Sequence, residues 1–187
     1  LSKIVIPLVA WSFIYYVVLI YNGSKVFSLK AFIYKFSTDS LAGHLWFMYT
    51  ILGLYLITPL LKILVRNATK RDVEYFLGLW IFASIILKLM VYLVGFSFSI
   101  ELFFVTKFVG YFVLGYYLFK YQITQKNIIF SQIALVIGLL GTFLLTYYGT
   151  TNNDGKLDQY WYEYHSITVF MISVGIFTLF KDILFKA

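Results

Sequence analysis

The fold class follows from one stretch of the chain, GHLWFMYTILGLYLITPLL at residues 43–61. From His44 to Leu61 the stretch carries no formal charge, and a helix of that length crosses most of a hydrocarbon core of ~30 Å at about 1.5 Å per residue. Because lipid offers polar groups no partner, we expect the polar face of this helix to turn toward other helices or a wet cavity. At about 100° per residue, that face consists of His44, Met48, Ile51, Tyr55, Thr58 and Lys62.

The composition of all 187 residues agrees with a membrane protein. Hydrophobic residues make up 61% and charged residues 12%, and the mean hydropathy is +0.86. Soluble domains average roughly 45–50% apolar and 25% charged residues. We therefore expect an all-α, polytopic transmembrane helix bundle, forming a single domain over residues 1–187. Its six spanning segments are predicted at residues 4–21, 44–65, 73–95, 102–119, 128–148 and 166–180.

The net charge of +7 does not indicate a nucleic-acid partner, because the Lys and Arg residues are scattered among the loops and form no single basic face. The chain has no cysteine, which excludes disulfides and thiolate metal sites, and we expect no bound metal or cofactor.

Two finer structural features are also predicted. The polar connection at residues 22–43 contains a short interfacial helix, and the small residues Ala134, Gly138 and Thr142 form a packing face.

Three motifs resemble those of the bacterial acyltransferase 3 family of integral membrane proteins. His44-Leu45-Trp46-Phe47, followed by Gly53-Leu54-Tyr55-Leu56-Ile57-Thr58-Pro59-Leu60, is similar to the signature of the family's fourth helix. Ile4-Val5-Ile6-Pro7-Leu8, leading into Trp11-Ser12, resembles the start of its third helix, and residues 111–118 (YFVLGYYL) resemble its sixth. The resemblance covers nearly the whole chain, and its specificity lies in the combined order and spacing of the motifs.

The resemblance implies an enzyme that moves an acyl group, in most members acetyl and occasionally succinyl, from acyl-CoA to a hydroxyl of a cell-surface glycan. It also aligns the chain with the third to eighth helices, without the first two and the last. The family's presumed catalytic histidine lies on its first helix, so we expect this chain expressed alone to be inactive. The alternatives are a transporter or polysaccharide export component, and an inactive remnant of the same family.

Within the chain, His44 is the candidate for the catalytic role, orienting substrate or assisting proton transfer. Alternatively, His44 is a histidine at the membrane interface whose ring caps the helix or contacts water. Trp46 and Tyr49 are candidates for holding a sugar ring or an acyl chain, and Tyr55 is a further candidate on the polar face. Alternatively, Trp46 and Tyr49 belong to the belt of aromatic residues at the membrane interface.

Two lysines lie inside predicted spanning helices, Lys88 and Lys107. An ionisable group there costs roughly 2.5–3.5 kcal/mol on insertion scales, so it usually faces the bundle interior and has a partner. Lys88 and Lys107 are candidate substrate-binding residues of an electropositive pocket that holds an oxyanion or a substrate phosphate. Ser84, Lys88 and Tyr92 share one helix face, so Lys88 can lie in a polar seam. The alternative for both lysines is that their long stems reach the headgroups, and we favour it for Lys107.

The longest polar loop, residues 149–165, ends in aromatic and charged residues. Trp161 and His165 are its candidate substrate-binding residues, because sugar rings stack on aromatic side chains and sugar hydroxyls bond to carboxylates. The alternative is a solvated turn followed by another aromatic belt. Its acidic residues do not form a calcium loop, because Gly155 directly follows Asp154 and no glutamate closes a twelve-residue pattern.

The resemblance implies a place in the bacterial cytoplasmic membrane, and the distribution of basic residues predicts that the N-terminus is cytoplasmic. In that orientation nine Lys and Arg residues lie inside and four lie outside, which also places the 149–165 loop and His44 near the outer surface. The nine are Lys3, Lys62, Arg66, Lys70, Arg71, Lys120, Lys126, Lys181 and Lys186, and the four are Lys25, Lys30, Lys35 and Lys156.

This orientation is testable by single cysteines, since the chain has none of its own. With the N-terminus inside, a cysteine at Asn153 should react with a membrane-impermeant thiol reagent on intact cells, and one at Ala68 should react only after the cells are opened. The reverse pattern would invert the orientation.

Overall fold

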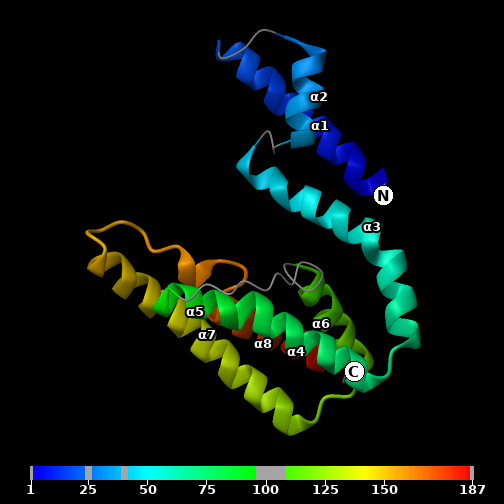
Figure 1. Cartoon of the computed structure of the whole chain (residues 1–187), viewed down its shortest axis with the longest axis vertical. Coiled ribbons are helices and arrows are strands. Elements are labelled where there is room, and N and C mark those ends of the chain that lie inside the picture. Colours follow the sequence, from blue (N-terminus) through cyan, green and yellow to red (C-terminus); the bar gives the residue numbers. More distant parts are fainter. Residues whose placement is uncertain (1, 24–26, 39–41, 96–107, 186–187) are drawn as a thin grey trace. The chain divides into compact units, whose positions relative to one another are not determined.

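The computed structural model describes residues 2–23, 27–38, 42–95 and 108–185, and all regular secondary structure in these ranges is helical (Figure 1). The chain divides into two compact units, Leu1–Asn67 and Ala68–Ala187. The first unit contains α1 (Ser2–Tyr21), α2 (Leu29–Thr38), η1 (Gly43–Leu45) and α3 (Trp46–Asn67). The second contains α4 (Lys70–Ile81), η2 (Phe82–Ile86), α5 (Leu87–Val94), α6 (Phe108–Lys120), α7 (Gln125–Asn152), η4 (Tyr160–Tyr162) and α8 (Ile167–Phe185).

Five helical segments of the described chain are long and apolar enough to cross a membrane, which confirms the all-α membrane fold. They are Ser2–Tyr21, Gly43–Asn67, Lys70–Val94, Gln125–Asn152 and Tyr160–Lys181, and they coincide with five of the six predicted runs. The remaining run contains α6, whose 13 residues are fewer than the ~20 that a span requires. Its first part, at residues 102–107, lies outside the described residues, so the sixth span stays a prediction.

In the first unit, two tyrosine hydroxyls tie the short helix α2 to its neighbours. The fully buried Tyr16 of α1 donates a hydrogen bond to the carbonyl of Ser28 (2.9 Å) and accepts one from the Ser28 N–H (3.2 Å). Tyr49 of α3 donates to the carbonyl of Phe36 at 2.8 Å. The helix predicted within residues 22–43 is therefore present as α2, and its position at the membrane interface stays a prediction.

The segment from Lys70 to Val94 is one continuous helix with a π-helical insertion, η2, in its middle. There the N–H of Leu87 bonds to the carbonyl of Phe82, five residues earlier. Such insertions are rare and frequently lie at functional sites. The helix ends where the sequence predicted, at Gly95, which takes the left-handed conformation (φ 68°) that glycine adopts without strain.

The core of the second unit lies between α4, η2 and α6 and is centred on Trp80, which is fully buried. A Cβ atom on Gly110 of α6 would lie only 2.0 Å from the Trp80 ring, so the indole packs directly on the backbone of α6. The ring also meets Tyr111 edge-on, with 4.7 Å between centroids. Val73, Leu77, Ile85, Val113 and Leu114 complete this cluster.

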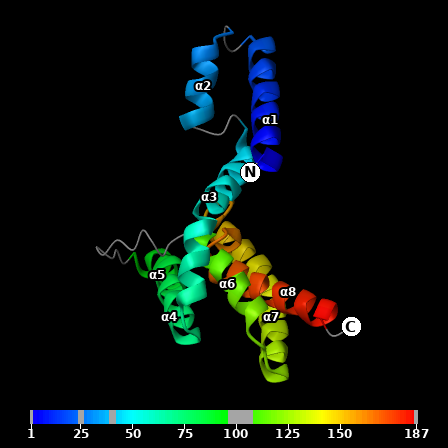
Figure 2. The same ribbon diagram turned by 90° about the vertical axis from the view of Figure 1, so that its right-hand side faces the viewer.

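α7 and α8 pack side by side through glycines (Figures 1 and 2). A Cβ atom on Gly138 of α7 would lie 2.8 Å from the Thr168 carbonyl, which confirms the predicted small-residue packing face at this position. From the opposite side, a Cβ atom on Gly175 of α8 would lie 2.5 Å from the Leu135 Cβ and 2.7 Å from the Ser131 carbonyl. The two backbones therefore approach too closely for any larger residue.

Contacts at the helix ends show that the long helices of the second unit and α6 alternate in direction. At one end, Tyr117 near the end of α6 donates to Glu74 near the start of α4 (2.6 Å), and Lys181 of α8 donates to the carbonyl of Leu118 (2.5 Å). At the other end, Tyr92 of α5 donates to Asp158, which precedes η4, at 2.5 Å. The predicted alternation is thus present within this unit.

The glycine contacts predict unequal effects of two alanine substitutions. Gly175→Ala should destabilise the protein by about 1–3 kcal/mol, because the new methyl group has no room beside Leu135 and Ser131. Gly78→Ala is the matched control, since a Cβ there meets nothing within 4 Å and alanine is the better helix former. Thermal unfolding in detergent measures both, and a Gly175→Ala variant as stable as the control would contradict the close approach.

Candidate functional site

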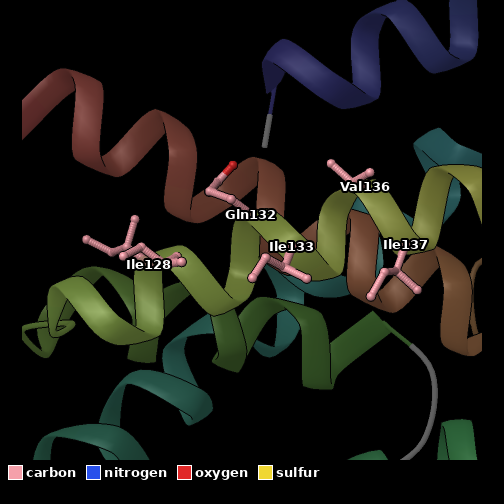
Figure 3. A pocket seen from close by; sticks show the side chains of 6 residues that line it. Ile128, Gln132, Ile133, Val136 and Ile137 are labelled. Atoms are coloured by element: carbon pink, nitrogen blue, oxygen red, sulfur yellow. The ribbon is translucent and has the colours of Figure 1, made fainter.

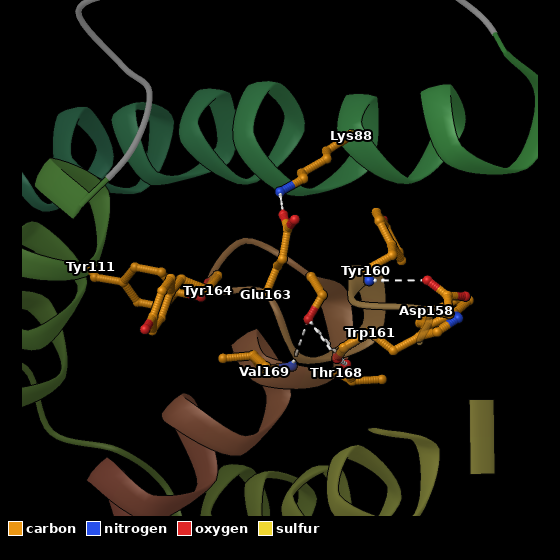
Figure 4. A network of polar contacts seen from close by, with 10 residues as sticks. Lys88, Tyr111, Asp158, Tyr160, Trp161, Glu163, Tyr164, Thr168 and Val169 are labelled. Carbon is orange, nitrogen blue, oxygen red and sulfur yellow. Dashed lines mark hydrogen bonds and ion pairs between the residues drawn. The ribbon is translucent and has the colours of Figure 1, made fainter. Parts of the chain in front are cut away.

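The candidate site is the segment from Asp158 to His165, between α7 and α8, together with the face of α5 that it contacts (Figure 4). Polar contacts hold the segment in one conformation. The carbonyl of Trp161 accepts hydrogen bonds from the hydroxyls of Ser166 (3.0 Å) and Thr168 (2.5 Å). The Ser166 hydroxyl also accepts the N–H of Val169 (3.3 Å) in the first turn of α8. The short serine and threonine side chains therefore join the segment to the start of α8.

Asp158 fastens the segment to both α7 and α5. Its carboxylate accepts the hydroxyl of Tyr92 (2.5 Å) and the N–H of Tyr160 (3.1 Å), and its own N–H donates to the Thr150 hydroxyl (3.1 Å). The carboxylate lies directly on the α7 backbone, because a Cβ atom on Gly149 would come within 2.2 Å of its Oδ2 atom. A larger residue than glycine at position 149 would displace this anchor.

An aromatic stack joins α5 to η4. The rings of Tyr92 and Tyr160 are parallel within 10° and their centroids are 3.9 Å apart, while Trp161 meets Tyr92 edge-on at 5.3 Å. Tyr160 and Trp161 are each only 9% exposed. The Trp161 ring therefore packs inside the segment and supports it, and the exposed aromatic rings here are those of Tyr162 and Tyr164.

Lys88 forms an ion pair with Glu163 across the gap between α5 and the segment (Figure 4). The two side chains are 36% and 47% exposed, so the pair lies at the edge of the protein and not in its core. Ser84, one turn earlier, is buried, and its hydroxyl has no hydrogen-bond partner among the described residues. Lys88 and Tyr92, which the spacing places on one helix face, thus both contact the 158–165 segment, while the catalytic role of Lys88 stays a prediction.

α6 contributes the far side of the site. Tyr111 donates a hydrogen bond to the carbonyl of Tyr164 at 2.6 Å. The half-buried His165 packs against Phe108 and Tyr111, with ring centroids 5.1 and 6.0 Å away. Nothing in the spacing of Tyr111 indicates that its hydroxyl reaches the 158–165 segment, so the sequence alone does not predict Tyr111 as a site residue.

The other candidates lie in the first unit or outside the described residues. His44 is exposed and meets the Tyr15 ring edge-on (5.1 Å, 69°), while the Trp46 ring lies 6.0 Å from that of Phe47. Tyr55 is 54% exposed. The structure therefore brings Lys88, Trp161 and His165 to one segment and places His44, Trp46, Tyr49 and Tyr55 in a separately described unit. Lys107 lies outside the described residues.

An open groove of about 430 Å³ runs along α7 (Figure 3). Gln132 is its one polar lining residue, and its amide donates to the Gly175 carbonyl (3.2 Å) and the Thr178 hydroxyl (3.3 Å) of α8. The remaining lining is branched and apolar, as on a lipid-facing surface, and it offers no group for acid–base or nucleophilic chemistry. These residues are Ile128, Ile129, Ile133, Val136 and Ile137.

The five long apolar helices define a membrane protein, and the 158–165 segment is its candidate site. The model of the acyltransferase 3 family, described as an acyltransferase domain, matches residues 1–187. The chain therefore belongs to this family, whose general reaction is acyl transfer. No match was found among curated proteins or solved structures.

The ion pair between Lys88 and Glu163 predicts the outcome of charge reversal. Lys88→Glu or Glu163→Lys alone places like charges opposite each other and should lower the stability by about 1 kcal/mol, a modest amount because both side chains are partly exposed. The double variant should recover most of that loss in thermal unfolding. A double variant as unstable as the sum of the single variants would show that the two side chains do not pair.

Proposed function

We propose that the protein transfers acetyl groups from acetyl-CoA, supplied on the cytoplasmic side, to a hydroxyl of a cell-surface glycan on the outer side of the bacterial cytoplasmic membrane. Membership of the acyltransferase 3 family supports the class of reaction. The excess of basic residues on one side of the predicted spans supports a cytoplasmic N-terminus, with the 158–165 segment outside.

The observation that carries the proposal is the contact of Lys88 with Glu163. An ammonium group has three N–H donors, and Glu163 is the one partner of Lys88 in the described part of the chain. When the acceptor hydroxyl attacks the acyl carbonyl, its proton passes to a general base and negative charge develops on the carbonyl oxygen. That charge returns to form the ester as the bond between the acyl carbon and the leaving group of the donor breaks. The remaining donors of Lys88 would stabilise that charge, and Glu163 would hold the ammonium group in place.

The surroundings of this pair suit a sugar acceptor. Tyr162 and Tyr164 flank Glu163 and are 41% and 53% exposed, so their rings present apolar faces with a polar tip beside a carboxylate. Carboxylate oxygens only accept hydrogen bonds, which matches the hydroxyl donors of a sugar. The buried Tyr160 and Trp161 would keep this surface rigid, so that little ordering remains to be done when the glycan binds.

The proposal predicts the effect of removing the charge of Lys88. In the native protein expressed in its own host, Lys88→Met should lower glycan acetylation about a hundredfold, the scale of losing one oxyanion donor. Acetate released from the purified glycan by mild alkali, identified by its mass, measures the activity, and immunoblotting of membranes measures the amount of protein.

Lys156→Met is the matched control, because Lys156 is an exposed loop residue on the same predicted side, and its activity should be unchanged. Equal acetylation by the two variants at equal abundance would refute the role of Lys88. A glycan that carries the same acyl esters with and without the gene would refute the proposed acceptor.

A further inference from the structure

A second cluster of charged and aromatic residues lies at the opposite end of the second unit, where α4 begins and α6 ends. The ammonium groups of Lys70 and Lys120 each lie 5.5 Å from the centroid of the same ring, that of Tyr121. Lys120 also lies 5.3 Å from the ring of Tyr116. Two like charges from different helices thus converge on one tyrosine, an arrangement whose repulsion an anion would relieve.

The carboxylates in the cluster do not balance these charges. Glu74 lies 3.6 Å from Lys70 but also accepts the hydroxyl of Tyr117 (2.6 Å), and Asp72 accepts the N–H and hydroxyl of Thr69, each at 2.8 Å. Lys120 has no carboxylate partner among the described residues. Among the side chains that the structure describes at this end, four cationic ones therefore stand against two anionic ones: Lys70, Arg71, Lys120 and Lys181 against Asp72 and Glu74.

The contacts of Lys181 with backbone carbonyls hold this end of the unit in a defined conformation. Its ammonium group donates to three carbonyls around the end of α6, those of Leu118 (2.5 Å), Phe119 (3.2 Å) and Tyr121 (2.9 Å). A cation at a helix C-terminus is favourable, because the last carbonyls are without helical partners. Lys181 therefore fixes the turn that carries Tyr121, and it adds positive charge to that turn.

The position of the cluster at helix ends predicts that it lies at the level of the lipid headgroups. Lys70 is the first residue of α4, and Lys120 is the last residue of α6. The ends of membrane helices lie in the interfacial region, where tyrosine and lysine are enriched and where basic pockets between helices bind anionic headgroups. By the predicted orientation this end faces the cytoplasm, whose leaflet carries anionic lipids in many membranes.

We propose that Lys70, Lys120 and Tyr121 form a binding site for the phosphate of an anionic phospholipid. The two ammonium groups hold the phosphate oxygens from α4 and α6, and the Tyr121 ring supports both lysines between them. The bound lipid neutralises the excess charge and joins the start of α4 to the end of α6. This site is independent of the acyl acceptor proposed above, since it lies at the other end of the unit.

Native mass spectrometry of the protein in detergent, titrated with phosphatidylglycerol and phosphatidylcholine, tests the site. The wild-type protein should retain phosphatidylglycerol in preference to phosphatidylcholine. Each lysine near a charged membrane surface contributes about fivefold in affinity, so Lys70→Gln with Lys120→Gln should weaken phosphatidylglycerol binding roughly 25-fold. Tyr121→Leu should also weaken it, because both lysines lose the ring that supports them.

The matched control is Lys126→Gln with Lys156→Gln, which removes the same charge at two exposed positions outside the cluster and should leave the preference unchanged. Equal weakening by the two double variants would reduce the effect to net charge and overturn the site. Inorganic phosphate and coenzyme A are added as soluble competitors. Displacement of the lipid by either one at a concentration below that of the lipid would overturn the assignment to a headgroup and assign the site to a soluble anion.

Discussion

Close approach of helix backbones at glycines is the constraint on which the second unit depends. Gly110 lies under the Trp80 ring, Gly138 and Gly175 lie between α7 and α8, and Gly149 lies beneath Asp158. In lipid no hydrophobic force drives one apolar helix onto another, so association depends on van der Waals contact and hydrogen bonds at short range. Glycine allows these short distances, and residues with side chains at these positions would separate the elements that carry the site.

These contacts explain why a polar segment forms a rigid surface at the end of apolar helices. With α7 and α8 held together, the residues between them have little freedom. Asp158, Tyr160 and Trp161 then fasten the segment to α5, whose Tyr92 supplies both a hydroxyl and a ring. The exposed residues of the segment, Glu163 among them, are consequently presented in a fixed position.

The two ends of the unit differ in how their cations are balanced. At the 158–165 segment Lys88 meets the carboxylate of Glu163, whereas at the other end Lys70 and Lys120 converge on Tyr121 with an excess of positive charge. A paired lysine keeps a defined position, which suits the stabilisation of a charge that develops only during reaction. A cluster whose positive charge is only partly compensated, as at Lys70 and Lys120, instead attracts an anion that is already charged.

The sequence by itself determined the membrane class, five of the six apolar helices that it predicted as spans, the end of α5 at Gly95, the packing face at Gly138 and the side of the helix on which Lys88 lies. Hydropathy and helical periodicity are properties of a single segment, and they indicate which face of that segment is buried. Only the tertiary structure decided that Lys88 meets Glu163, that Trp161 is buried and that the long helix passes through a π turn. These features depend on which helices approach each other and how closely, because residues 75 positions apart become partners only once the helices between them have packed.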